Sequence, residues 1–265
     1  MLGYESMGSD VVISVENLVK YYGSLKALDR ISFQVRRGEI YGLLGPNGAG
    51  KTTTLKIIVG LLKPSNGTVK VLNYSPVENA VNVKRVIGYV PEEVYLYESL
   101  TVREFFEFVA SVRGLSEEVF SWVDMLVKSF NIEEYYDYPI ASLSQGTKQK
   151  VTIISALMHK PEVLILDEPI KGLDAKSARI FKEIMHLHIQ NGGAILFSTH
   201  IMDIAENICT RIGIIHKGRI LAEGSVDDLK RMVNEPTGTL EEVFLELTRE
   251  REEVTDIINE LRRVF

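Results

Sequence analysis

Short apolar runs alternate with amphipathic stretches along most of the chain. The run at 39–44 is predicted to be a short buried strand, and the runs at 163–166 and 194–197 are apolar throughout. Short, fully apolar strands that alternate with helical patterns indicate a parallel sheet covered on both faces. The runs at 11–15 and 31–35 are β-branched and aromatic with partial alternation, which also predicts strands. The pattern as a whole predicts an α/β fold.

Helical spacing dominates the stretch that follows Pro91. Thr101 and Glu104 form a capping-box pattern, which predicts a helix that runs to about Arg113 and ends at Gly114. Residues 226–265 mix acidic and basic side chains, also with helical spacing. The other predicted elements are strands at 68–72 (after a turn at 63–67, as a second hairpin) and 86–90, helices at 116–130, 146–158 and 175–190, and a hairpin at 211–223.

Composition excludes several classes of protein. The 265 residues carry a formal net charge of −6, which argues against nucleic acid as the main partner. A single cysteine, Cys209, excludes an internal disulfide and a cysteine-based metal cage. No run reaches the roughly 18 apolar residues of a membrane span, and residues 1–10 lack the pattern of a signal peptide. Any function at a membrane is therefore expected to depend on a partner.

The most specific motif is a fit to G-x-x-x-x-G-K-[ST] between the strand at 39–44 and a helical pattern that starts at Thr53. Strand, glycine-rich turn and helix is the context that this motif requires. Backbone N–H groups of such a turn and the helix N-terminus favour an anion. Lys51 is expected to reach the β- and γ-phosphates of a nucleotide, and Thr52 to ligate Mg²⁺. The predicted nucleotide-binding residues of this loop are Gly45, Pro46, Asn47, Gly48, Ala49, Gly50, Lys51, Thr52 and Thr53.

Two carboxylates, Asp167 and Glu168, follow the apolar run at 163–166. In a P-loop fold this end of the strand faces the nucleotide. Asp167 is therefore expected to bind Mg²⁺, and Glu168 to orient and polarise the attacking water. Ser144 and Gly146 stand at the start of a predicted helix and form a second candidate anion site. Taken alone, they are also compatible with an ordinary helix N-cap.

Together these motifs resemble the ATP-binding subunit of an ATP-binding-cassette (ABC) transporter, over about residues 11–223 and in the order typical of the family. The resemblance implies a P-loop NTPase core with a mixed, mainly parallel sheet, an antiparallel β subdomain and an inserted α-helical subdomain. It also implies ATP and Mg²⁺ as cofactors. The implied division is an ATPase domain at 11–225, with the helical subdomain at about 94–158, and a helical extension at 226–265.

The resemblance also assigns roles to single residues. Ser144, Gln145 and Gly146 correspond to the signature loop, which acts on ATP bound to the other subunit of a head-to-tail dimer. Tyr22 corresponds to the aromatic residue that stacks on adenine, and Tyr21 is the alternative candidate for this role. The aspartate that reaches across the dimer corresponds to Asp174, which is also a candidate N-cap. The switch histidine that contacts the γ-phosphate corresponds to His200.

Three positions depart from the family pattern. Glu92 stands where a glutamine is usual; its carboxylate can approach Mg²⁺, but when ionised it donates no hydrogen bond. Ile170 and Lys171 replace a small polar pair, which points to altered dimer contacts. Thr147 replaces a larger residue, and no consequence is evident.

The resemblance therefore implies an ATPase that drives an integral membrane permease subunit, together with a second, identical or different, ABC ATPase subunit. Its expected place is the cytoplasmic face of the cell membrane, with the partner's helix received near 92–113 and no nucleic acid bound. The segment at 239–248 and the run at 52–54 resemble the drug, lipid and polymer exporter branch, which favours export. A soluble ABC ATPase in cofactor assembly and a nucleotide sensor without turnover remain as alternatives.

Overall fold

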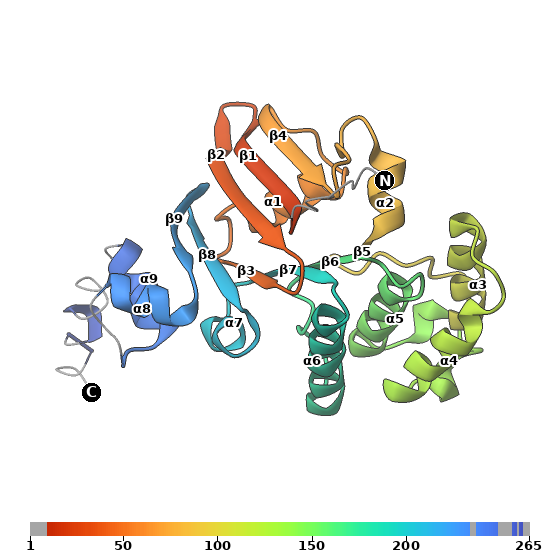
Figure 1. The fold of residues 1–265 in the computed structure, drawn as a ribbon. Coiled ribbons are helices and arrows are strands. Elements are labelled where there is room, and N and C mark those ends of the chain that lie inside the picture. Colours follow the sequence, from red (N-terminus) through yellow and green to blue (C-terminus); the bar gives the residue numbers. More distant parts are fainter. Residues whose placement is uncertain (1–9, 234–236, 249–255, 259, 262–265) are drawn as a thin grey trace, which may run out of the picture.

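A six-stranded sheet forms the centre of the computed structural model, which describes residues 10–233, 237–248, 256–258 and 260–261 (Figure 1). Its strand order is β5-β6-β7-β3-β8-β9. The first five strands in this order are parallel, and β9 pairs antiparallel with β8. The strands are β3 (Ile40–Leu44), β5 (Ile87–Val90), β6 (Val163–Asp167), β7 (Ala194–Thr199), β8 (Arg211–His216) and β9 (Arg219–Gly224). Every residue of β3, β6 and β7 is buried, which confirms the predicted covered parallel sheet.

A second, antiparallel sheet has the order β2-β1-β4. Its strands are β1 (Val11–Tyr22), β2 (Leu25–Arg36) and β4 (Asn66–Val71). The second hairpin predicted around 68–72 is wrong, because β4 pairs with β1 rather than with a neighbour in the chain. The strands β1 and β2 are also longer than predicted. Register shifts between Val15 and Leu18 break the alternation on which the prediction depended.

Helices cover both faces of the central sheet. The described helices are α1 (Lys51–Ile58), α2 (Ala80–Val86), α3 (Val102–Arg113), α4 (Val119–Ser129), α5 (Gln145–Leu157), α6 (Ala175–Gln190), α7 (Met202–Ile208), α8 (Val226–Met232) and α9 (Leu240–Thr248), with short 3₁₀ turns at Glu133–Tyr135 and Ile140–Ser142. The capping box of Thr101 and Glu104 is present, and Gly114 ends α3 in a left-handed conformation. The helix predicted at 116–130 begins later, at Val119, and the short helices α2 and α7 were not predicted.

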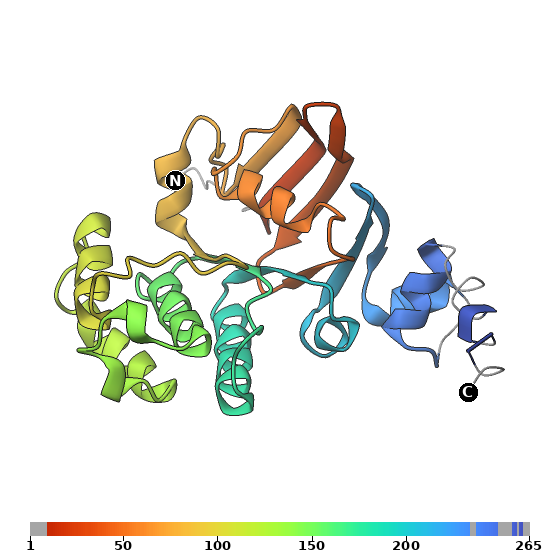
Figure 2. The same cartoon turned by 180° about the vertical axis from the view of Figure 1, so that it is seen from behind.

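The central sheet separates two apolar cores. Leu164 and Leu166 of β6 pack with side chains from α3, α4, α5 and α6. Val163 and Ile165 of the same strand pack with α1 and the antiparallel sheet. Figures 1 and 2 show this arrangement from opposite sides, with α1 between the two sheets. Because consecutive residues of a strand point to opposite faces, each buried strand contributes to both cores.

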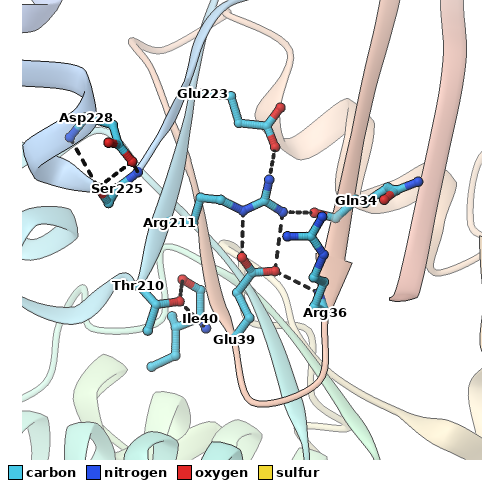
Figure 3. Close-up of polar contacts among 9 residues, drawn as sticks. All are labelled: Gln34, Arg36, Glu39, Ile40, Thr210, Arg211, Glu223, Ser225 and Asp228. Atoms are coloured by element: carbon cyan, nitrogen blue, oxygen red, sulfur yellow. Dashed lines mark hydrogen bonds and ion pairs between the residues drawn. The ribbon is translucent and has the colours of Figure 1, made fainter. Parts of the chain in front are cut away.

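An ion-pair network joins β8 and β9 of the central sheet to β2 and to the residue just before β3 (Figure 3). The Arg211 guanidinium donates from Nε to Glu39 Oε1 at 2.6 Å, and from Nη1 to Glu223. Its Nη2 donates to the Gln34 carbonyl oxygen, and the group lies 4.9 Å from the centroid of the Tyr41 ring. A single side chain therefore holds strands from both sheets together.

The chain after β9 packs against β3 and β8 of the central sheet. Side chains of α8 and α9 form a third apolar cluster with β3 and β8, which includes Leu229, Leu240 and Phe244. Within 226–265, where helical spacing was predicted, the structure contains α8 and α9. The parts of the predicted extension at 234–236, 249–255, 259 and 262–265 lie outside the described residues. Within the described ranges, no helix has the length and apolar character needed to cross a membrane.

Candidate nucleotide-binding site

The glycine-rich loop lies between the end of β3 and the start of α1, as predicted. Gly50 is the N-cap of α1 and has a φ of 112°, a conformation that favours glycine. Gly45 packs so closely that a Cβ atom there would lie 2.1 Å from the Ile215 carbonyl oxygen. The Lys51 side chain is buried, and its Nζ donates to the carbonyl oxygens of Gly45 (2.7 Å) and Pro46 (3.1 Å). Carbonyl groups of the loop thus hold the Lys51 ammonium group at the start of α1.

A cavity of about 210 Å³ opens at this loop. It is lined by Ala27, Asn47, Gly48, Gly50, Lys51, Thr52, Thr53 and Glu92. Burial lowers the pKa of Lys51, and the charges of Glu168, Asp167 and Glu92 oppose that shift. The structure therefore brings the predicted lysine and all three predicted carboxylates together. Larger cavities of about 530 and 300 Å³ have other linings.

Asp167 ends β6 beside Ser198 of the adjacent strand β7. The Ser198 hydroxyl donates to Asp167 Oδ1, while Asp167 Oδ2 is buried without a hydrogen-bond partner among the described residues. Burial raises the pKa of Asp167, and the hydroxyl groups of Ser198 and Thr52 oppose the rise. A buried carboxylate oxygen without a donor, close to a hydroxyl group and a second carboxylate at Glu92, fits the oxygen ligands that Mg²⁺ prefers. The residues present therefore suit the predicted metal.

Glu168 is turned back towards the end of β7. Its φ is 49°, in the left-handed region, and its side chain is buried. The carboxylate accepts hydrogen bonds from Thr199 Oγ1 (3.0 Å) and from the His200 backbone N–H (2.8 Å). His200 Nδ1 lies 2.5 Å from Glu168 Oε1. The two residues predicted for catalysis are therefore in direct contact.

The hydroxyl groups of Ser198 and Thr199 were not assigned a role from sequence. Each of them fixes one of the two carboxylates at the end of β6. The available signal was that two hydroxyl residues end an otherwise apolar strand, and both are buried in the structure. In such a setting a hydroxyl needs a polar partner.

The signature loop lies at the start of α5 and contributes nothing to the lining of the 210 Å³ cavity. Ser144 is the N-cap, and its Oγ accepts from the Thr147 backbone N–H at 3.2 Å; Gln145 is the first residue of the helix. A Cβ atom at Gly146 would lie 2.7 Å from the Gly172 carbonyl oxygen. The loop therefore packs against the segment that follows Glu168.

Asp174 belongs to the same group of residues. It is the N-cap of α6, where its Oδ1 accepts from the Ser177 backbone N–H at 2.8 Å. Its Oδ2 also lies 2.8 Å from Lys150 Nζ of α5. Lys150 and then Ser177 hold the pKa of Asp174 well below its usual value. The N-cap expectation is thus confirmed, within a cluster separate from the cavity.

Tyr22 and Tyr21 end β1 and are both exposed. Tyr22 is paired with Leu25 of β2, and Ala27 follows two residues later in the same hairpin. Ala27 lines the cavity, so Tyr22 belongs to the hairpin that reaches the phosphate loop. Tyr21 instead lines a different hollow, with Lys26 over its ring.

Comparison with known proteins places these motifs in a family. Residues 28–171, just over half of the chain, match the family described as ABC transporter. This chain therefore belongs to the ABC transporter family. It is 35% identical over 247 residues to the probable multidrug ABC transporter ATP-binding protein YbhF of Escherichia coli (strain K12). That alignment covers 92% of this chain but only 43% of YbhF, so the chain spans less than half of that relative's length.

Solved structures agree with this assignment. A structure described as the ATP-binding subunit of an ABC transporter has a TM-score of 0.86 and 36% identity, and the match covers 89% of this chain and 99% of that one. The ATP-binding cassette MJ0796, solved as a dimer in a post-hydrolysis state with ADP and Pi, has a TM-score of 0.72 and 25% identity. That match covers 80% of this chain and 98% of the cassette. The predicted fold class is thereby confirmed.

Proposed function

We propose that this chain is the ATP-hydrolysing subunit of an ABC transporter. In this proposal it closes as a head-to-tail dimer around two Mg-ATP at the cytoplasmic face of the cell membrane, and powers export by a membrane-embedded partner. The observation that carries the proposal is the meeting of Lys51, which follows β3, with Asp167 and Glu168 at the end of β6, at the carboxyl edge of the parallel sheet. Ligands of open α/β sheets bind at this edge.

The phosphate loop supplies the binding site for ATP. The nitrogen of Lys51 exchanges the carbonyl oxygens of Gly45 and Pro46 for oxygens of the β- and γ-phosphates. Backbone N–H groups at the start of α1 add further donors. Tyr22, exposed at the end of β1 in the hairpin that contains Ala27, offers its ring to adenine.

Thr52, Asp167 and Glu92 are the residues that would hold Mg²⁺. The metal would supply positive charge that offsets the negative charge of the transferring phosphoryl group. Asp167 is suited to this task because Ser198 fixes Oδ1 while Oδ2 lacks a donor.

Glu168 and His200 perform the hydrolytic step. Glu168 accepts a proton from the attacking water, whose oxygen bonds to the γ-phosphorus as the bond to the β–γ bridging oxygen breaks. Contacts from Thr199 and the His200 backbone fix the carboxylate for this task. His200 contacts Glu168 through Nδ1, which leaves Nε2 to face the γ-phosphate.

The dimer follows from the position of the signature loop. Ser144, Gln145 and Gly146 lie away from the cavity of their own chain, next to Gly172. In a head-to-tail pair they act on the ATP of the second ABC ATPase subunit, and Asp174 lies beside them at the same interface. The dimeric MJ0796 cassette supports this arrangement.

A groove of about 300 Å³ suits a helix of the permease subunit. Its lining comes from α2, α3, α5, β5 and the segment after α1, and includes Leu61, Val109 and Arg113. Leu61 is 59% exposed, which leaves an apolar contact for a partner. Export is favoured by the description of YbhF as a multidrug transporter protein and by the C-terminal segment that contains α9.

Glu168→Gln tests the chemistry. The amide keeps the shape, since its oxygen accepts from the His200 N–H and its nitrogen donates to Thr199 Oγ1, but it takes up no proton. We expect ATP binding to be retained and phosphate release to fall by roughly 10²- to 10⁴-fold. Glu162→Gln makes the same change at an exposed carboxylate and should leave turnover unaltered. Normal phosphate release by Glu168→Gln would remove this residue from its role.

Purification from native membranes tests the transport assignment. Tagged protein should carry a polytopic membrane protein in near-equal amount. Recovery with soluble assembly factors alone would leave the ATPase proposal intact and refute transport.

A further inference from the structure

Two departures from the family pattern meet in the structure. Glu92 and Lys171 lie 79 positions apart in sequence, and Lys171 Nζ donates to Glu92 Oε1 at 3.2 Å. One replaces a neutral glutamine by an acid, and the other replaces a small polar residue by a base. The two changes together therefore leave the local charge unaltered.

Glu92 occupies a sensitive place for an additional negative charge. It lines the cavity at the phosphate loop. It is also close enough to Lys51 and Asp167 for its charge to act on both. Together with Asp167 and Glu168, it is one of three carboxylates whose charges act on the buried Lys51. An unpaired Glu92 would repel the phosphates that this cavity is proposed to bind.

Lys171 stands on a segment that is fixed on both sides. Its backbone N–H donates to the Glu168 carbonyl oxygen at 3.1 Å, and the next residue, Gly172, packs against Gly146 of the signature loop. Its side chain is 62% exposed and that of Glu92 is 37% exposed. Ion pairs with this exposure add little to folding stability, so the contact has no evident value as a structural support.

We propose that Lys171 is a positioning residue for nucleotide binding, which neutralises Glu92 and holds its carboxylate at the rim of the cavity. This inference rests on the proposed function and adds a residue to the binding site. Without Lys171, and before Mg²⁺ binds, the uncompensated charge of Glu92 repels the phosphates and weakens binding. With glutamine at position 92 there is no negative charge for Lys171 to neutralise.

A double-mutant cycle on ATP binding tests the coupling. Affinity is measured by calorimetry in EDTA, so that the readout depends neither on Mg²⁺ nor on turnover. The proteins are the wild type, Lys171→Ala, Glu92→Gln and the double variant. Any long-range attraction between Lys171 and ATP is common to both backgrounds and cancels in the cycle.

We expect Lys171→Ala to weaken binding by about three- to tenfold more in the wild type than in the Glu92→Gln background. The excess should shrink at high salt, because exposed charges are screened. Lys171→Arg should bind as the wild type does. Lys176→Ala removes the same charge from an exposed residue on α6 and should show no coupling to Glu92.

Equal losses in the two backgrounds would overturn the proposal and assign Lys171 to a contact elsewhere, such as the dimer interface. No loss in either background would overturn it as well. Failure of the wild type to bind ATP would instead overturn the proposed function itself, and this inference with it.

Discussion

Arg211→Met is expected to be among the most damaging single changes outside the nucleotide site. The arginine pairs with Glu39 and Glu223, and the three side chains are 22%, 12% and 28% exposed, respectively. Removing one member of a buried ion pair typically costs 3–5 kcal/mol, because the other charge stays behind without a partner. Here two carboxylates are left behind, but each keeps partial contact with water. We therefore expect a loss of about 2–4 kcal/mol in the free energy of unfolding.

The assay is equilibrium unfolding in urea, followed by the fluorescence of Trp122, the single tryptophan. The matched control is Arg37→Met. Arg37 pairs with Glu162, but these side chains are 42% and 50% exposed, so the expected loss is below about 1 kcal/mol.

A triple variant tests whether the unpaired carboxylates cause the loss of stability. Changing Arg211 to methionine together with Glu39 and Glu223 to glutamine removes the stranded charges, and should cost less than Arg211→Met alone. Equal unfolding midpoints for Arg211→Met and Arg37→Met would refute the reasoning. So would a triple variant less stable than the single one.

Two further predictions concern buried titratable groups. Burial lowers the pKa of His159 to about 4, and its Nε2 bonds the Ile87 carbonyl oxygen at 2.9 Å. The unfolded chain, with a histidine pKa near 6.5, binds more protons between these values, so stability is complete above pH 6.5 and falls towards pH 4. His159→Gln should reduce that slope by up to about 1.4 kcal/mol per pH unit in unfolding titrations, and an unchanged slope would contradict this assignment. Burial also raises the pKa of Cys209 to about 12, so an aromatic disulfide reagent should react slowly with the native protein and rapidly in denaturant; equal rates would contradict this.

The phosphate loop and the two carboxylates were predictable because their physical requirements are local. Gly45 and Gly50 occupy positions that other residues do not fit, and a fully apolar strand ending in acid residues has few alternatives. The spacing of these residues in the sequence is therefore sufficient to predict this part of the site. The same holds for α3, whose start and end were both predicted from its caps.

Other features depend on contacts between distant segments. The pairing of β4 with β1 produces no recognisable pattern in the sequence of either strand. The β-bulges in β1 interrupt its alternation, so its full length was not predicted. The helices α2 and α7 have seven residues each, too few to show a clear period. The contact of Glu92 with Lys171 combines two positions that each look anomalous alone, and only the fold shows that they compensate.

The left-handed backbone of Glu168 has a consequence for how this protein can change. A non-glycine residue with a φ of 49° costs about 1–2 kcal/mol, a cost that glycine does not incur. Glycine would relieve this cost but would lose the contacts of the carboxylate with Thr199 and His200, and the proposed hydrolysis is a further reason to retain the acid. A copy of the gene released from the need to hydrolyse ATP should lose this glutamate early, while its apolar strands stay the same. Position 168 thus records whether a lineage still uses the enzyme.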